Sequence, residues 1–267
     1  MVSPDTPAIE ISKLVSHYGD RKILHEIDMT VAQGEIMVIM GGSGSGKSTL
    51  LRHFLGLNRP TSGSVKLLGQ DITRISAQEM FVLRRQMGVS FQGGALFNSM
   101  SVAENVALPL REHTKLDENT IQIMARMKLE VVNLNGFEDL MPSELSGGML
   151  KRAALARAIA LDPRLLFFDE PSAGLDPVAS VELDELILNL QEAMGMSIVV
   201  VTHELESAFK IADRITVLDQ GHILLTGTVA EVRGSDHPRI VSLLQRQPRH
   251  DEVDGDAYLQ RLTRELT

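Results

Sequence analysis

The stretch Gly41–Thr49, with the sequence GGSGSGKST, limits the possible folds of this chain more than any other feature. The apolar run Glu35–Met40 precedes it with the composition of a buried strand, and Leu50–Leu55 continues as the start of a helix. A strand, a glycine-rich loop and a helix form the context in which G-x-x-x-x-G-K-[ST] binds phosphate. The glycines let backbone N–H groups turn toward an anion, and the helix N-terminus adds partial positive charge.

The residues of this loop have separate expected roles. We expect Lys47 to reach the outer phosphates and the hydroxyl of Ser48 to hold Mg²⁺. The other loop residues surround the phosphates: Gly41, Gly42, Ser43, Gly44, Ser45, Gly46 and Thr49. The alternative is a glycine-rich turn with a solvated lysine, and a chain of this size contains such a match by chance in about 1% of cases. A nicotinamide fingerprint is excluded because these glycines contain no G-x-G-x-x-G.

Composition and charge exclude several classes of protein. The chain has 267 residues, 43% of them hydrophobic and 23% charged, as in an ordinary soluble globular protein. Its net charge of -9 argues against nucleic acid as the main partner, because a phosphate backbone demands a basic face. The lack of cysteine excludes disulfides and thiolate metal sites. Met1–Asp5 lacks a basic start and no apolar run approaches about 20 residues, so we expect no signal peptide, no membrane span and a cytoplasmic location.

The order of the expected elements favours an α/β core with two additions. Alternating patterns over Ile9–Val15 and Ile23–Val31 predict strands of a small N-terminal antiparallel sheet. From residue 93 to about residue 161 the strand-like runs stop, and Ser101–Glu104 fits a capping box at the start of a helix. We therefore expect a helical subdomain over about 93–161, inserted into the core.

After this insertion the α/β pattern resumes and then gives way to a polar tail. From about Asp236 the chain is polar and charged, and Pro238 and Pro248 are expected to interrupt short helices. We expect one domain over residues 1–233. The tail over residues 234–267 is a candidate for contacts with a second copy or with another partner.

Three expected buried strands end in polar residues that suit a single site. They lead into Gly41–Thr49, into Asp169-Glu170 and into Thr202-His203. In an open parallel sheet, ligands bind outside the carboxyl ends of the strands. Carboxylates after a strand often form only a solvated turn, and a histidine there is often structural. The coincidence of all three at strand ends favours a functional site.

The expected roles of these residues follow from strand geometry. Successive side chains of a strand point to opposite faces, so Asp169 and Glu170 cannot do the same work. We expect Asp169 to bind Mg²⁺ and Glu170 to polarise the water that attacks the γ-phosphate. His203 would contact the γ-phosphate or that water, and Gln92 suits a contact with Mg²⁺ or water. Tyr18 either stacks on a nucleobase or covers the core, and the sequence leaves both open.

The segment Leu145–Met149 contains a second candidate anion site. A serine hydroxyl and two glycine amides, from Ser146, Gly147 and Gly148, open a helix there. The plainer alternative is a flexible helix cap. The composition suits the γ-phosphate of a nucleotide that another copy of the chain holds.

Together these motifs resemble those of ABC-transporter ATPases, over roughly residues 8–233. The matching elements are Gly41–Ser48, Gln92, Leu145–Gly148, Phe167–Glu170, Ser172–Asp176 and His203. The resemblance implies a P-loop NTPase (RecA-like) fold and a head-to-tail dimer that encloses ATP, in which Ser146, Gly147 and Gly148 complete the partner's site. It also implies that Tyr18 stacks on adenine and that Asp176 lies in a loop that communicates between the sites. Glu170 and His203 match the catalytic glutamate and the switch histidine.

The sequence departs from the pattern of the ABC-transporter ATPases at two positions, and it resembles one group within that family more closely. Met149 replaces the usual glutamine, and Gly174 lengthens the loop before Asp176, but neither change removes a phosphate contact. The segments Phe91–Phe97, Glu104–His113 and Met141–Ala160 look most like the Mla ATPase subunits, in which Met149 is typical. Other cargo, or a soluble ABC ATPase that acts on DNA or ribosomes, is the alternative.

The closer resemblance implies partners and a location. It implies phospholipid transport in a Gram-negative envelope, with the chain peripheral on the cytoplasmic side of the inner membrane. The partners would be a transmembrane permease (MlaE-like), a small STAS-domain protein (MlaB-like) and an MCE lipid-binding subunit (MlaD-like). The permease would dock a cytoplasmic helix beside Gln92 and residues 95–102.

Overall fold

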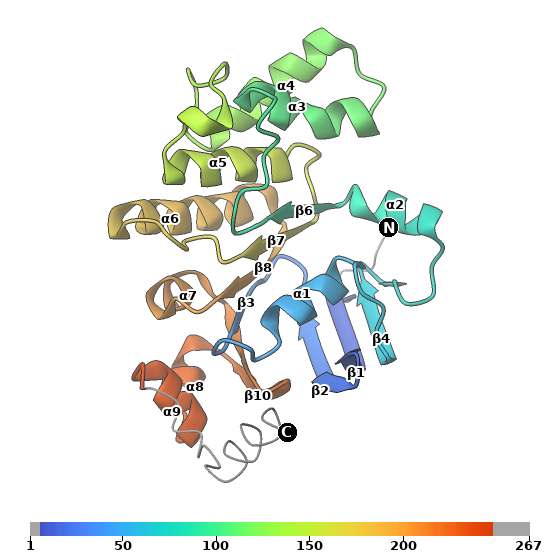
Figure 1. The fold of residues 1–267 in the computed structure, drawn as a ribbon, viewed down its shortest axis with the longest axis vertical. Helices are drawn as coiled ribbons and strands as arrows, with labels where there is room; N and C mark the ends of the chain where they lie inside the picture. The colour runs from blue at the N-terminus through green and yellow to red at the C-terminus, as the bar shows by residue number, and fades with distance from the viewer. Residues whose placement is uncertain (1–5, 248–267) are drawn as a thin grey trace, which may run out of the picture.

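Two β-sheets organise the structure (Figure 1), a computed structural model that describes residues 6–247. The antiparallel sheet has the order β2-β1-β4-β5, with β1 Ile9–Tyr18, β2 Arg21–Val31, β4 Ser62–Leu67 and β5 Gln70–Asp71. The larger sheet has the order β10-β9-β3-β8-β7-β6, with β3 Ile36–Met40, β6 Met87–Ser90, β7 Leu165–Asp169, β8 Ser197–Thr202, β9 Arg214–Asp219 and β10 His222–Gly227. Its strands run parallel except β10, which pairs antiparallel at the edge.

Helices occupy most of the connections between these strands. They are α1 Lys47–Phe54, α2 Ala77–Arg84, α3 Val102–His113, α4 Glu118–Val131, the 3-10 turn η1 Pro142–Glu144, α5 Gly147–Ala158, α6 Pro177–Met194, α7 Leu205–Ile211, α8 Val229–Arg233 and α9 Pro238–Leu244. Among residues 6–247, none of these helices combines the length and hydropathy needed to cross a bilayer. The expected fold class, a P-loop core with an antiparallel sheet and inserted helices, is confirmed.

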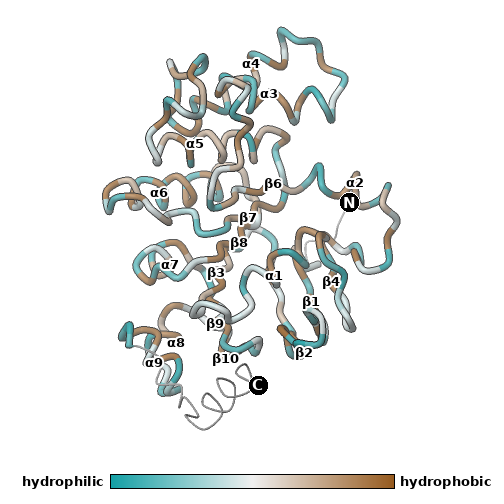
Figure 2. Tube along the Cα trace, viewed as in Figure 1, coloured by the Kyte–Doolittle hydropathy of each residue, from teal (hydrophilic) through white to brown (hydrophobic). Residues whose placement is uncertain are grey.

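The central strand β3 separates two hydrophobic clusters. Ile36, Val38 and Met40 pack into a cluster with α3 to α7, whereas Met37 and Ile39 pack into a second cluster with α1, α2 and the antiparallel sheet. This division follows from the alternation of side chains along a strand. Because both faces are covered, the strand is apolar throughout, and hydrophobic residues mark the central strands in Figure 2. The loop after β3 is therefore anchored on a rigid base.

The helices α3, α4, η1 and α5 lie between β6 and β7 in the chain and form the upper end of the molecule in Figure 1. The expected capping box is present: Glu104 N donates to Ser101 Oγ (3.2 Å), and Ser101 N donates to Glu104 Oε2 (2.7 Å). Fully buried Asn105 accepts from the backbone N–H of Phe97 (2.8 Å) and contacts the carbonyl of Met100 (3.1 Å). These bonds fix the loop that leads from Gln92 into α3.

The structure corrects one expectation about the tail. Pro238 does not interrupt a helix but is the first residue of α9, where its missing N–H costs no hydrogen bond. Ile240 is buried in the main core, and Arg239 Nε donates to Asp219 Oδ2 (3.0 Å), so the start of the tail packs on its own chain. Pro248 lies outside the described residues, and the boundary between a domain over 1–233 and a tail over 234–267 stays a prediction.

Candidate functional site

The loops after β3, β6, β7 and β8 meet at one edge of the parallel sheet and line a cavity of about 750 Å³. The predicted residues that line it are Gly41, Gly42, Ser43, Gly44, Lys47, Ser48, Gln92, Asp169, Glu170 and His203. Sequence reasoning missed a group at the end of α9 and beyond: Ser242, Leu243, Arg246 and Gln247 line the same cavity. Their signal was weak, because nothing in a polar tail indicates which surface it covers.

The phosphate-loop backbone takes conformations that require glycine. A Cβ atom at Gly41 would lie 2.1 Å from the carbonyl oxygen of Leu218, and Gly46 has a φ of 108°. Lys47 Nζ donates to the carbonyl oxygens of Gly41 (2.7 Å) and Gly42 (3.1 Å). Burial lowers the pKa of Lys47, while Glu170 and Asp169 raise it. The loop thus folds around the ammonium group of Lys47, and at Gly41 it leaves no room for a side chain.

Asp169 and Glu170 have different environments. Asp169 is the last residue of β7, and its pKa is raised chiefly by burial and then by the neighbouring charge of Glu170. Glu170 has left the strand: its φ is 49°, in the left-handed region, and its N–H donates to Val201 O (2.8 Å). The expectation that strand alternation separates the two carboxylates is therefore wrong, because a backbone turn at Glu170 separates them.

His203 follows β8 and contacts Glu170 directly. Its Nδ1 lies 2.9 Å from Glu170 Oε2, and its backbone N–H donates to the same oxygen (3.3 Å). Its Nε2 lies 3.4 Å from Glu204 Oε1. The carboxylate fixes the orientation of the imidazole, so the two predicted groups form one unit at the cavity wall.

Oxygen ligands suited to Mg²⁺ also line the cavity. They are the hydroxyl of Ser48, the carboxylate of Asp169 and the side-chain amide of Gln92. Mg²⁺ prefers one or two protein oxygens together with phosphate and water. This donor set fits the ion expected from the sequence.

Several predicted residues lie outside this cavity in the same chain. Ser146, Gly147, Gly148 and Asp176 line a separate cavity of about 450 Å³ between the N-termini of α5 and α6. Ser146 Oγ accepts from Met149 N (3.3 Å), and Asp176 Oδ1 accepts from the N–H groups of α6. Tyr18 ends β1 with 76% of its surface exposed, so it does not cover the core. Ser45 is a buried residue of the loop, and Thr49 lies within α1.

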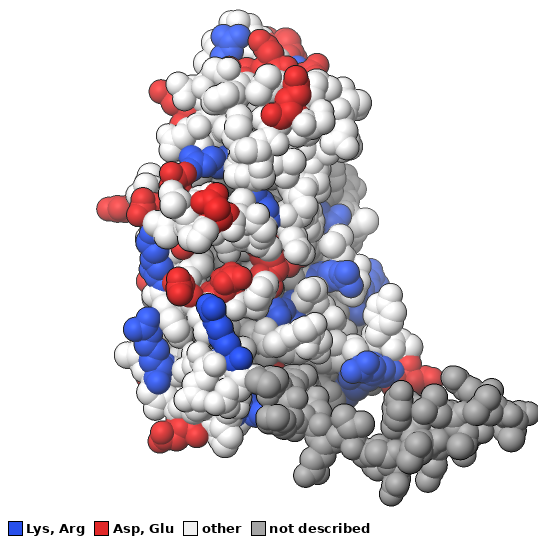
Figure 3. Space-filling model, turned by 60° about the vertical axis from the view of Figure 1, so that its left-hand side comes forward, with Lys and Arg blue, Asp and Glu red and all other residues white. Residues whose placement is uncertain are grey.

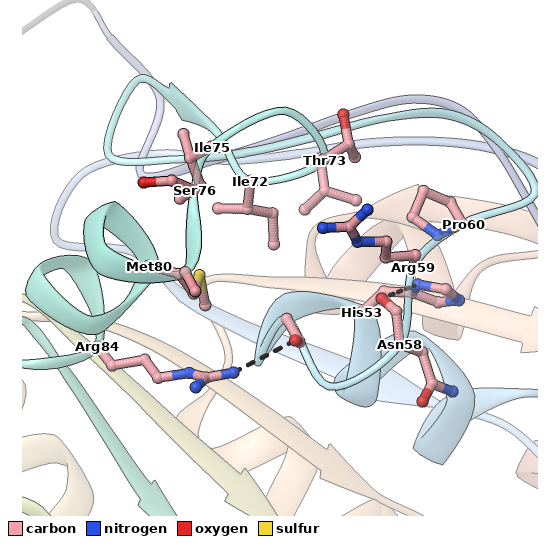
Figure 4. Close-up of a pocket in the computed structure, with 13 residues that line it drawn as sticks. His53, Asn58, Arg59, Pro60, Ile72, Thr73, Ile75, Ser76, Met80 and Arg84 are labelled. Carbon is pink, nitrogen blue, oxygen red and sulfur yellow. Dashed lines mark hydrogen bonds between the residues drawn. The ribbon is translucent and has the colours of Figure 1, made fainter.

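A third cavity, of about 220 Å³, lies among α1, α2 and β4 and contains none of the predicted residues (Figure 4). Two of its polar side chains already bind backbone carbonyls. His53 Nδ1 lies 3.1 Å from Asn58 O, and Arg84 Nη2 donates to Gly56 O (3.3 Å). Burial lowers the pKa of His53. These contacts hold the turn after α1 and indicate a structural role.

Comparison with known proteins agrees with this geometry. The family model described as "ABC transporter" matches residues 24–173. The chain belongs to the ABC transporter family. The chain therefore binds ATP, and ATP hydrolysis is its reaction.

Relatives of this ABC transporter cassette confirm its resemblance to the Mla ATPases. It is 45% identical to the intermembrane phospholipid transport system ATP-binding protein MlaF of Haemophilus influenzae, over 89% of this chain and 90% of the relative. It is 44% identical to the MlaF of Escherichia coli K12, over 85% of this chain and 84% of the relative. The probable ribonucleotide transport ATP-binding protein mkl of Mycobacterium tuberculosis is 40% identical, over 89% of this chain and 66% of the relative.

Solved structures of ATP-binding cassettes have the same fold as this chain, and one of them is a dimer. A dimeric post-hydrolysis state of an ATP-binding cassette with bound ADP and phosphate matches with a TM-score of 0.77 and 29% identity, over 83% of this chain and 98% of that one. The protein cbiO1 of Clostridium perfringens, part of an ABC transporter complex, matches with a TM-score of 0.80 and 28% identity, over 96% of this chain and 100% of that one.

Replacing Asp169 tests the electrostatics of the cavity. Because burial and Glu170 raise the folded-state pKa of Asp169, its ionised form opposes folding above that pKa. Without nucleotide, Asp169→Asn should raise the melting temperature by about 1–3 °C at neutral pH. The difference should shrink as the pH falls toward the unfolded-state pKa of about 4. Circular dichroism melts across pH measure it, with exposed Asp139→Asn as the unchanged control. A lower melting temperature at neutral pH would contradict the account.

Proposed function

We propose that this chain is the ATP-hydrolysing motor subunit of an ABC transporter that moves phospholipids between the membranes of a Gram-negative envelope. The observation that carries the reaction is the single cavity shared by Lys47, Asp169, Glu170 and His203. The cargo is supported by the MlaF relatives, which align over 90% and 84% of their length. The mkl relative favours nucleotide cargo but aligns over only 66% of its length. Phospholipid is therefore the better-supported cargo.

The residues of the cavity divide the work of phosphoryl transfer. Lys47 and the loop amides bind the outer phosphates of ATP. Glu170 accepts the proton of the attacking water, and its bond to His203 orients both groups toward the γ-phosphate. Mg²⁺, held by Ser48, Gln92 and Asp169, would neutralise charge on the phosphates. Tyr18, exposed at the end of β1, is free to stack on adenine.

The remaining part of the site comes from a second copy of the chain. Ser146, Gly147 and Gly148 form a helix N-terminus suited to phosphate, but they line a different cavity from Lys47. Because Asp176 lines that cavity too, a copy approaching it meets both the helix N-terminus and the communicating loop. Dimeric cassettes among the structural neighbours support this arrangement. ATP would thus close the dimer, and its hydrolysis would release it.

We further propose the partners of an Mla-type complex. A transmembrane permease would dock beside Gln92 and residues 95–102, with a STAS-domain protein and an MCE lipid-binding subunit in the same assembly. The chain would lie on the cytoplasmic side of the inner membrane. Acidic and basic side chains both occur on the face shown in Figure 3, and the net charge is -9, which argues against a nucleic-acid partner.

Replacing the proposed general base separates binding from turnover. Glu170→Gln keeps the shape of the side chain and its contact with His203 but removes the proton acceptor. ATP affinity should remain, and turnover should fall by at least about 10²-fold. Phosphate release and binding of a fluorescent ATP analogue measure the two quantities. Glu206→Gln, an exposed change on α7, should hydrolyse normally. Near-normal hydrolysis by Glu170→Gln would rule out the assignment.

Mixing two inactive variants tests the shared site. A dimer of one Ser146→Arg chain and one Lys47→Ala chain contains one intact site if Ser146 acts on the partner's ATP, and none if it acts on its own. We expect the purified heterodimer to hydrolyse ATP, although each variant alone does not. Differential affinity tags isolate the heterodimer for phosphate-release assays. No activity above the single variants, or two working sites, would refute the arrangement.

Reconstitution tests the cargo. The chain purified with its membrane partners from detergent should transfer a labelled phospholipid between liposomes when MgATP is supplied. A complex carrying Lys47→Ala should show only background transfer. A labelled ribonucleotide enclosed in or added to the same liposomes provides the comparison. ATP-driven movement of the ribonucleotide without phospholipid transfer would contradict the proposed cargo.

A further inference from the structure

The lysine Lys151 binds two segments of the site from inside the protein. It lies in the first half of α5 with 7% of its surface exposed, although no motif predicted a role for it. Its Nζ donates to the backbone carbonyl of Gln92 and to that of Glu170 (3.3 Å). A buried ammonium group is costly unless it is hydrogen-bonded, so its bonds to the two carbonyls stabilise it there.

The carbonyl of Glu170 belongs to a strained residue. A φ of 49° in a non-glycine residue is sterically strained and persists only where the surroundings impose it. The N–H of Glu170 is bound to Val201 O, and its carbonyl is bound to Lys151. The two sides of this peptide segment are therefore held by β8 and by α5. The carbonyl also accepts from the N–H of Ala173 (3.2 Å), a bond within its own loop, so without Lys151 no bond from α5 holds it.

The carbonyl of Gln92 lies at the start of the loop that leaves β6. Gln92 is exposed, and its backbone is fixed to the helical subdomain by Lys151. Burial lowers the pKa of Lys151, while the charges of Asp169 and Glu170 raise it. The ammonium group thus lies within the electrostatic reach of both carboxylates, behind the cavity rather than in it.

We propose that Lys151 is a positioning residue for hydrolysis, which holds the backbones of Gln92 and Glu170 of its own chain in their reactive geometry. The inference rests on the proposed roles of these two residues. Lys151 does not touch the nucleotide. It acts through the residues that do, and it joins them to the helix whose first residues face the second copy. Misplacement of a catalytic group by about 1 Å can cost about 10²-fold in rate.

Kinetics of three variants test the role. Lys151→Met keeps the length of the stem but cannot donate, so turnover should fall about 10–100-fold with ATP affinity changed less than about 2-fold. Lys151→Arg, which can donate to both carbonyls, should recover part of the loss. Lys128→Met, which removes an ion pair with Asp162 elsewhere in the helical subdomain, is the matched control. Turnover within about 3-fold of wild type for Lys151→Met, or equal losses in turnover and affinity, would overturn the proposal.

The heterodimer of Ser146→Arg and Lys47→Ala chains locates the effect. Its one working site takes Gln92 and Glu170 from the Ser146→Arg chain and Ser146 from the other. Lys151→Met should reduce activity when placed on the Ser146→Arg chain and should have little effect on the Lys47→Ala chain. Equal loss in both arrangements, or loss only in the second, would show that Lys151 supports the helix N-terminus instead.

Glu170→Gln, assayed beside these variants, separates the two proposals. If Glu170→Gln is inactive while Lys151→Met hydrolyses normally, only the positioning role is wrong. If Glu170→Gln hydrolyses normally, the proposed role of Glu170 as the general base is wrong, whatever Lys151→Met shows. Thermal melts of all the variants confirm that each assay measures folded protein.

Discussion

Parallel pairing of β3 with β8, and of β8 with β7, is the constraint on which the whole site depends. Met40 pairs with Thr202, and Asp169 pairs with Val201, so the three strands end at nearly the same level. Their loops must then leave on one edge, which places a phosphate loop, two carboxylates and an imidazole around one cavity. A shift in strand register would separate these groups, even with every residue unchanged.

Charges in and behind this cavity balance one another. Lys47 and Lys151 approach the Asp169-Glu170 pair from different elements, and burial lowers the pKa of both lysines. The pKa of Asp169 is raised for the same reason. Burial of these charges opposes folding, but the arrangement suits a site that receives a polyanion with a divalent cation. The ionised carboxylate of Asp169 therefore lowers the stability of the nucleotide-free chain, although the proposed binding of Mg²⁺ requires it.

Much of this site could be predicted from the sequence because its parts follow apolar strands. The apolar segments before Gly41, Asp169 and His203 are typical of strands in a parallel sheet that is covered on both faces. In such sheets, ligands bind at the carboxyl ends of the strands. The left-handed turn at Glu170 could not be predicted, since nothing in the local sequence requires a glutamate to take positive φ. The hydrogen bond from Lys151 to the carbonyl of Gln92 could not be predicted either, because it joins segments far apart in the chain.

The structure of the tail could not be predicted from its local sequence either. Proline was expected to break a helix, but Pro238 begins α9, and its position relative to the helix start was not readable from composition. α9 packs on the core through Ile240, which is buried, and through Leu243 and Leu244, which are partly buried. The start of α9 is bound to the end of β9, where Arg239 Nε donates to Asp219 Oδ2. The position of α9 depends on the surface that the rest of the chain presents to it, and the local sequence of the tail carries no information about that surface.

The central claim is that the phosphate loop is half of a site that a second copy closes. Because the chain has no cysteine, one spin label at Ser143→Cys, exposed beside the helix N-terminus, gives no signal within a single copy. Dipolar spectroscopy on the full chain with its membrane partners should show one defined distance between labels when Mg²⁺ and a non-hydrolysable ATP analogue are added. Lys47→Ala should abolish this nucleotide-dependent distance. A distance distribution that is the same with and without nucleotide would contradict the account.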